Sequence, residues 1–163
     1  MKYDPEFHVV LYQPEIPYNT GSVGRTCVAV GAKLWLVRPL GFTVDDKQLR
    51  RAGLDYWPHL EWEVVDDWDD LLRKLPRPPR WYFSKKAEHS YADVSYERGD
   101  VFVFGSESQG LPESMITAEN ALRIPVRSAV RSLNLSNSVA VIAYEAMRQW
   151  GGVEAGSGTD ISS

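Results

Sequence analysis

The sequence contains a single cysteine, Cys27, among its 163 residues. One thiol excludes an internal disulfide and a cysteine metal cluster. The three histidines do not stand at metal-ligand spacings with carboxylates, so no metal site is predicted. No apolar run approaches the roughly 20 residues that cross a bilayer, and the first residues, MKYDPEFH, lack a signal-peptide pattern. We therefore expect a cytoplasmic protein that makes no membrane contact.

A surplus of positive charge is also absent. The formal net charge is −4 at pH 7, whereas nucleic-acid-binding domains usually have a basic surface. Any RNA site must therefore depend on local groups of basic residues. Arginines within site loops are the best candidates, because a guanidinium group matches a phosphate bidentately. The basic groups are Lys47, Arg50 and Arg51; Arg73, Lys74, Arg77 and Arg80; Lys85 and Lys86; and Arg123, Arg127 and Arg131.

Signatures of several common enzyme classes are missing. The turn at residues 19–25 reads Asn-x-Gly-x-x-Gly-Arg, which has neither the G-x-G-x-x-G spacing of a dinucleotide site nor the Gly-Lys-Ser/Thr of a Walker loop. The G-x-S-x-G elbow is absent, and Ser106 and Ser108 have no neighbouring base. Cys27 falls inside a predicted helix and is interpreted as a small core residue. Hydrolase, metalloenzyme and Rossmann-type functions are therefore disfavoured.

The most informative stretch is VFVFGSESQGLP, residues 101–112. Its first four residues are apolar without polar alternation, which predicts a strand buried on both faces of a parallel sheet. Ligand sites in such sheets form at the carboxyl ends of the strands. We therefore expect residues 105–111 to form a ligand-binding edge. Glu107 in this loop could accept hydrogen bonds from a ligand's amine or ribose, or could cap the following turn.

Strand and helix patterns alternate along the whole chain. Asn19 or Thr20 is the predicted N-cap of the first helix, and Gly31 is predicted to end it. The alternation predicts an α/β domain with a mainly parallel sheet flanked by helices, over residues 1–150. The Gly/Ser-rich residues 151–163 are predicted to be a disordered tail. Strands are predicted at 7–12, 33–37, 62–65, 81–84, 101–104 and 121–124, and helices at 19–30, 45–52, 66–75 and 135–150.

The last predicted helix has two distinct sides. At about 100° per residue, one side is a core face. The opposite side offers Val, Tyr and Arg, which is typical of an interface but also of scattered exposed residues. The core face holds Leu135, Val139, Ile142, Ala146 and Trp150, and the other side holds Asn137, Val141, Tyr144 and Arg148.

Four ordered segments, which together run from Leu11 to Gln149, carry a family resemblance. They read LYQPEIPYNTGSVGRTC, PLGFTVDDKQLRRAGLDYW, VFGSESQGLP and RIPVRSAVRSLNLSNSVAVIAYEAMRQ. The chain resembles the SPOUT methyltransferases, and the segment around residues 49–57 is similar to their TrmL (YibK-like) group. The resemblance implies a SPOUT fold with a C-terminal trefoil knot. It also implies a homodimer with the site at the subunit interface.

The activity implied by the resemblance is methyl transfer from S-adenosylmethionine, without a metal. The acceptor would be the ribose 2′-hydroxyl of nucleotide 34, a cytidine or modified uridine in the anticodon stem-loop of tRNA, with leucine tRNAs as the expected substrates. One alternative is a ribosomal RNA 2′-O-methyltransferase, which the absence of an additional RNA-binding domain disfavours. Another is a non-catalytic RNA-binding SPOUT protein, which intact Arg25, Gly105, Ser132 and Asn134 disfavour.

The resemblance also assigns residues to roles. Arg25 would act at the reaction centre, with Tyr144 and Asn19 positioning substrate or loops. Because a guanidinium group stays protonated, we expect Arg25 to bind the nucleotide phosphate or polarise the hydroxyl rather than act as a base. Substrate RNA would be contacted by Arg25, Arg131, Lys47 and Arg50. The expected cofactor-binding residues are Phe83, Gly105, Glu107, Gly110, Ile124, Ser132, Leu133 and Asn134.

Overall fold

The computed structural model of the protein describes residues 5–45, 47–52 and 55–152, without the side chains of residues 50 and 52. The predicted tail at 151–163 lies outside the described residues except for Gly151 and Gly152. None of the helices in the described ranges is long and apolar enough to cross a membrane.

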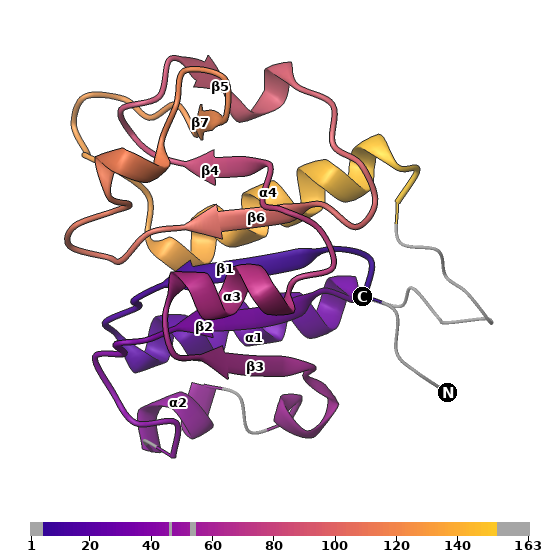
Figure 1. The fold of residues 1–163 in the computed structure, drawn as a ribbon, viewed down its shortest axis with the longest axis vertical. Helices are drawn as coiled ribbons and strands as arrows, with labels where there is room; N and C mark the ends of the chain where they lie inside the picture. The colour runs from indigo at the N-terminus through magenta and orange to yellow at the C-terminus, as the bar shows by residue number, and fades with distance from the viewer. Residues whose placement is uncertain (1–4, 46, 53–54, 153–163) are drawn as a thin grey trace.

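A seven-stranded sheet runs through the described part of the chain, in the order β3-β2-β1-β6-β4-β7-β5. Every neighbouring pair of these strands is parallel, which confirms the predicted sheet (Figure 1). The two-residue strand β5 was not expected, because it lies next to a polar loop. The strands are β1 His8–Tyr12, β2 Lys33–Val37, β3 Trp62–Val65, β4 Trp81–Phe83, β5 His89–Ser90, β6 Val101–Phe104 and β7 Ala121–Arg123.

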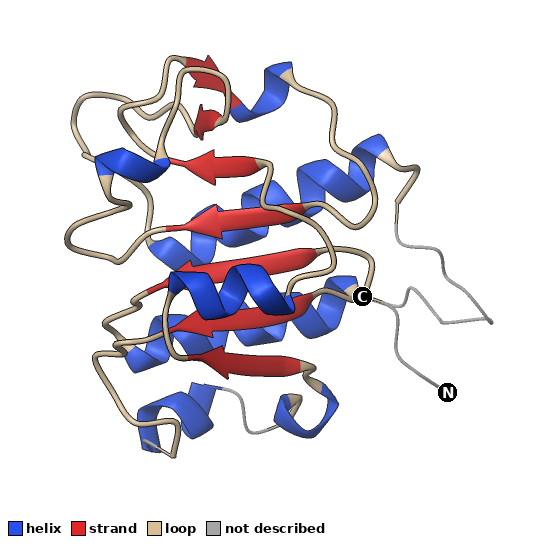
Figure 2. Ribbon diagram, in the orientation of Figure 1, coloured by secondary structure: helices blue, strands red, loops and turns tan. Residues whose placement is uncertain are grey.

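Helices cover both faces of the sheet, with α1 and α4 on one face and α3 on the other (Figure 2). The side chains of β1 alternate between two apolar cores. Val9 and Leu11 pack with α1 and α4, while Val10 packs with α3. The helices are α1 Pro17–Val30, α2 Lys47–Ala52, α3 Trp68–Lys74 and α4 Leu135–Gln149, and short 3-10 helices span Trp57–His59 (η1), Tyr91–Asp93 (η2) and Glu113–Met115 (η3).

The start of α1 differs from the prediction. The helix begins at Pro17 with Ile16 as its N-cap, so the N-cap assignment to Asn19 or Thr20 is wrong. Proline suits the first helical position, because its ring fixes φ and its missing N–H would have no helical partner there. Asn19 and Thr20 are therefore buried within the helix. Gly31 ends the helix in the left-handed conformation (φ 77°), as predicted.

The two sides of α4 are confirmed. Val139, Ile142 and Ala146 are buried, whereas Tyr144 on the opposite side is 53% exposed. Asn134 caps the helix by accepting a hydrogen bond from the Ser136 N–H. The trefoil knot that the resemblance implies stays a prediction.

Candidate active site

A pocket of about 660 Å³ opens at the carboxyl ends of the central strands. Its size lies within the roughly 300–1,000 Å³ that is usual for small-molecule sites. The walls come from the start of α1, the loops after β4 and β6, and the loop between β7 and α4. The arrowheads of β4 and β6 in Figure 1 point to this edge. The pocket therefore lies where a parallel sheet is expected to bind a ligand.

The apolar lining of the pocket includes the last residues of two strands. Phe83 ends β4 and Phe104 ends β6. Their rings are stacked, with centroids 4.6 Å apart and planes 9° apart. Leu122 and Ile124 of the β7 segment also line the pocket. Flat apolar surfaces of this kind suit a planar aromatic group on a ligand.

The loop after β6 turns back tightly on itself. Ser106 and Gly110 form an isolated antiparallel bridge, in which the Gly110 N–H donates to the Ser106 carbonyl over 3.0 Å. A Cβ atom on Gly105 would lie 2.2 Å from the Gly110 carbonyl carbon. Only glycine fits at position 105, because a side chain there would collide with the backbone of Gly110 and Leu111 in the returning part of the same loop.

Glu107 caps α1 from this loop. Its carboxylate accepts hydrogen bonds from the backbone N–H groups of Glu15 (2.8 Å) and Ile16 (2.9 Å). It also accepts one from the Asn19 side-chain amide over 3.2 Å. A negative charge stabilises the positive end of the helix dipole, and the N-cap Ile16 has no side-chain acceptor of its own. Glu107 thus caps α1, not the turn that follows it in sequence.

Glu15 makes the reciprocal contact. Its carboxylate accepts hydrogen bonds from the hydroxyl (2.7 Å) and the backbone N–H (2.8 Å) of Ser108. These hydrogen bonds, that of the Ser108 hydroxyl first, lower the pKa of Glu15 below its usual value. We call this pair of contacts the Glu15–Glu107 clasp. It fastens the segment before α1 to the loop after β6.

Asn19 extends the clasp to the other wall of the pocket. Its side-chain oxygen accepts a hydrogen bond from the Asn134 amide over 3.1 Å, while its own amide donates to Glu107. Asn134 in turn caps α4. Three polar side chains thereby connect the beginnings of α1 and α4 with the β6 loop.

The structure brings the predicted cofactor-binding residues together around one pocket. Asn19 and Arg131, which were assigned to catalysis and RNA binding, also lie there. Glu107 lines the pocket with its oxygens already engaged in the clasp, and its role as a cofactor ligand stays a prediction. The predicted cofactor-binding residues in the lining are Phe83, Gly105, Glu107, Gly110, Ile124, Ser132, Leu133 and Asn134.

Arg25 and Tyr144 do not line the pocket of their own chain. Arg25 is exposed on α1, and its guanidinium carbon lies 5.5 Å from the centroid of the Tyr56 ring. Tyr144 is exposed on α4. Lys47 is exposed on α2, and Arg50 lies on the same helix with a side chain outside the described part. One chain therefore holds a pocket and, apart from it, the arginine assigned to catalysis.

Apolar side chains are exposed near the beginnings of α1 and α4. Ile16 is 44% exposed and Tyr18 is 59% exposed, and Leu133 just before α4 is also exposed. Because α1 and α4 pack together, these residues and Tyr144 lie on two adjoining helices. Exposed apolar groups of this kind mark interaction surfaces. The sequence had indicated only the Tyr144 side, since Ile16 and Tyr18 precede any recognisable helical pattern.

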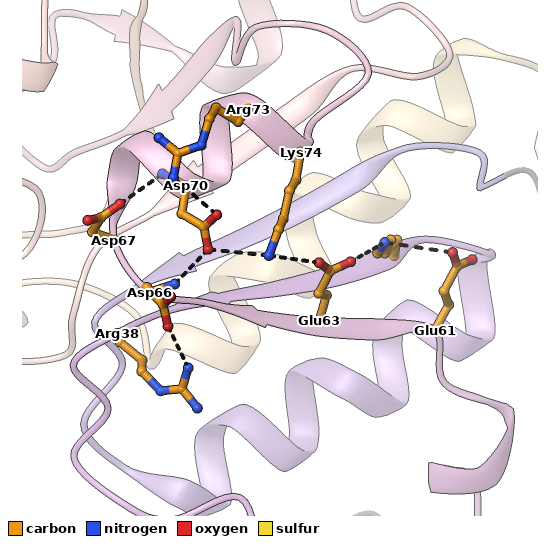
Figure 3. Close-up of polar contacts among 9 residues, drawn as sticks. Arg38, Glu61, Glu63, Asp66, Asp67, Asp70, Arg73 and Lys74 are labelled. Atoms are coloured by element: carbon orange, nitrogen blue, oxygen red, sulfur yellow. Dashed lines mark hydrogen bonds and ion pairs between the residues drawn. The ribbon is translucent and has the colours of Figure 1, made fainter.

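Many cations away from the pocket are neutralised. Lys74 on α3 contacts Glu63 of β3 and Asp70 within its own helix, and Arg38 pairs with Asp66, as Figure 3 shows. Lys33 contacts Glu61 and Glu63. Lys85, Arg123 and Arg131, by contrast, line the pocket. The exposed cations with no carboxylate partner among the described residues are Arg25, Lys47, Arg51, Lys85, Arg123, Arg127 and Arg131. Unpaired positive charge therefore gathers at the pocket and along α1 and α2.

In the described ranges, no group of three or more His, Cys, Asp or Glu side chains is placed to hold a metal ion.

Comparison with known proteins gives consistent matches over most of the chain. The pattern of the SpoU rRNA Methylase family matches residues 6–144. A tRNA (cytidine(34)-2′-O)-methyltransferase of Methylovorus glucosotrophus is 46% identical over 146 residues, covering 88% of this chain and 95% of the relative. The enzyme of the same name from Burkholderia ambifaria is 47% identical over 150 residues, covering 89% and 96%. A solved structure reported for the 2-OH methylation of C/U34 on tRNA has a TM-score of 0.85 and 48% identity, covering 89% of this chain and 96% of its own.

Proposed function

The chain belongs to the SpoU rRNA Methylase family, and from that premise we propose that it methylates the ribose 2′-hydroxyl of nucleotide 34 of a tRNA. The observation that carries the proposal is the 46% identity to a relative that is named for this reaction, of which 95% of the length is matched. The base at position 34 would be cytidine or a modified uridine, and leucine tRNAs are the proposed substrates. We also propose a cytoplasmic protein with a single SPOUT domain at residues 1–150.

The pocket fits S-adenosylmethionine as methyl donor. The Phe83, Phe104 and Ile124 side chains offer an apolar surface for a planar base, and Gly105 and Gly110 of the tightly turned loop after β6 also line the pocket. The cofactor, when bound, supplies a methyl group on a good leaving group. The residues that would hold it are those of the pocket lining, chiefly Phe83, Gly105 and Ile124 with the loop at residues 132–134.

The remaining work of the protein is alignment of the ribose, activation of its hydroxyl and exclusion of water. Arg25 suits the first two tasks because no carboxylate among the described residues neutralises it. Its guanidinium group would bind the nucleotide phosphate and bring the hydroxyl into line. Since guanidinium stays protonated, the hydroxyl proton would leave to phosphate or water.

The unpaired cations suit a polyanionic substrate. Lys85, Arg123 and Arg131 surround the pocket, and Lys47 and Arg51 flank α1. Neutralising phosphates with free cations releases counterions and makes RNA binding depend on salt. A net acidic chain can therefore bind RNA, because several exposed cations at the pocket and beside α1 have no carboxylate partner among the described residues.

A second copy of the chain would complete the site. Arg25 and Tyr144 lie outside the pocket of their own chain, and exposed Ile16, Tyr18 and Tyr144 offer an apolar surface on α1 and α4. We propose a homodimer joined through this surface, in which Arg25 of one subunit serves the pocket of the other.

The experiment is incubation with labelled S-adenosylmethionine and either unmodified tRNA or ribosomal RNA, followed by mapping of nuclease-resistant 2′-O-methyl positions. We expect label in tRNA alone. Label in ribosomal RNA alone would show that the substrate is ribosomal RNA and not tRNA. Absence of label from every RNA would contradict the enzymatic function. Arg25→Ala should abolish transfer and leave cofactor affinity largely intact, whereas a large loss of cofactor binding would show that Arg25 belongs to the pocket.

A further inference from the structure

Tyr56 lies beneath the side chain of Arg25. The Arg25 guanidinium carbon is 5.5 Å from the centroid of the Tyr56 ring, within the roughly 6 Å at which a cation and an aromatic face attract. Tyr56 is only 7% exposed, whereas Arg25 is exposed. We propose that Tyr56 is a positioning residue, whose ring holds the Arg25 guanidinium in the orientation that receives the nucleotide phosphate. This inference rests on the proposed role of Arg25.

The ring itself is fixed by α1 and by the edge of the sheet. A Cβ atom at Gly24 would lie 3.2 Å from both Cε2 and Oη of Tyr56, so the bare helix backbone leaves just enough room for the ring. Tyr56 also packs beside Trp57, with ring centroids 6.3 Å apart. Trp57 in turn packs on Trp62 of β3 at 4.9 Å. This run of aromatic contacts fixes the platform under Arg25.

An aromatic partner does what a carboxylate could not do for Arg25. A carboxylate would orient the guanidinium group by occupying its N–H donors and neutralising its charge. A ring face attracts the cation from one side and leaves every in-plane donor free. Arg25 has no carboxylate partner among the described residues, so both its charge and its donors remain available for a phosphate.

The phenol oxygen of Tyr56 has no part in this role. It is buried and has no hydrogen-bond partner among the described residues. Burial raises the pKa of the phenol to about 12, so the group is neutral at physiological pH. An unsatisfied buried hydroxyl stabilises nothing, and phenylalanine should replace tyrosine without loss.

The test compares Tyr56→Leu, which removes the ring face, with Tyr56→Phe, which keeps it. Leu60→Ala is the matched control, because the Leu60 side chain packs against Gly24 beside Tyr56 and does not lie under Arg25. We expect Tyr56→Leu to lower kcat for methyl transfer to tRNA by about two- to fivefold, the range of an exposed cation–π contact. Cofactor affinity should be unchanged in all three variants, and Tyr56→Phe and Leu60→Ala should keep the wild-type kcat.

A loss of kcat in Tyr56→Phe equal to that in Tyr56→Leu would overturn the inference, because the hydroxyl would then be the active group. An equal loss in Leu60→Ala would also overturn it, because Tyr56 would then matter only for folding. If the wild-type protein methylates no RNA, the proposed function fails and a second readout decides the inference. The NMR order parameter of the Arg25 Nε–H should fall in Tyr56→Leu and not in Tyr56→Phe. Unchanged order in Tyr56→Leu would contradict the proposal.

Discussion

Glu107→Ala tests whether the Glu15–Glu107 clasp holds the first helix in place. The substitution removes the acceptor of the Glu15 and Ile16 N–H groups and of the Asn19 amide. Loss of a charged N-cap costs about 0.5–2 kcal/mol, and hydrogen bonds to a charged group contribute about 1.5–3 kcal/mol when they are well formed. Because these donors can be rehydrated, we expect a loss of about 2 kcal/mol in the free energy of unfolding. For a chain of this size that corresponds to a fall of about 4–8 °C in Tm.

The assay is thermal unfolding followed by circular dichroism, together with calorimetric titration of S-adenosylmethionine. Glu113→Ala is the control, since its exposed carboxylate pairs only with Lys86 among the described residues. An exposed ion pair contributes little to stability because water screens it, so this variant should unfold close to the wild-type Tm. The Tm of Glu107→Ala should lie well below the Tm of Glu113→Ala.

An unchanged Tm in Glu107→Ala would refute the clasp. If cofactor affinity nevertheless dropped more than tenfold, Glu107 would be a direct cofactor ligand. A fall in Tm with little change in affinity is the result that the structure predicts.

Three other perturbations test the loop after β6, the unpaired arginines and the dependence of stability on acid pH. Gly105→Ala should abolish cofactor binding in calorimetry and lower Tm, because the alanine Cβ would lie 2.2 Å from the Gly110 carbonyl carbon and force the loop after β6 to move. Wild-type cofactor affinity in this variant would contradict the proposed role of the loop in cofactor binding. Replacing Arg123 and Arg127 by alanine should reduce the slope of log K for RNA binding against log salt by about 1.4–1.8, while Arg38→Ala, which removes a paired cation, should change it little. Folding lowers the pKa of Glu15 below its ordinary 4.5, so its contribution is complete above that pH and is lost as the pH falls through the folded pKa. Tm should therefore fall less steeply between pH 5 and pH 3 in Glu15→Gln than in wild type, and equal slopes would contradict this assignment.

The architecture could be predicted from local patterns. The unbroken apolar run of residues 101–104 indicated a strand covered on both faces, and β6 is fully buried at the centre of the sheet. The spacing of Val139, Ile142 and Ala146 likewise indicated the buried side of α4. Such patterns succeed because burial repeats with the period of the element itself.

The start of α1 could not be predicted in the same way. Asn19 and Thr20 have good N-cap chemistry, yet the helix begins at Pro17 and its acceptor is Glu107, about ninety positions further along the chain. A long-range contact of this kind leaves no mark on the neighbouring sequence. The same applies to the ring of Tyr56 under Arg25, which depends on how α1 packs against the segment after α2.

The residues that the family resemblance assigns to cofactor binding line one pocket, because motifs that are distant in sequence converge at one edge of the sheet. The net charge did not indicate where unpaired cations lie on the surface. The total of −4 hides the pairing of Lys33, Arg38 and Lys74 with carboxylates, and only the structure separates these cations from the unpaired ones at the pocket.

The most direct test of the central claim uses two versions of one tRNA, which carry either ribose or 2′-deoxyribose at nucleotide 34 and are otherwise identical. With labelled S-adenosylmethionine, the ribose version should gain one methyl group at nucleotide 34 and the deoxyribose version none. Equal labelling of both would contradict methyl transfer to the 2′-hydroxyl of that nucleotide.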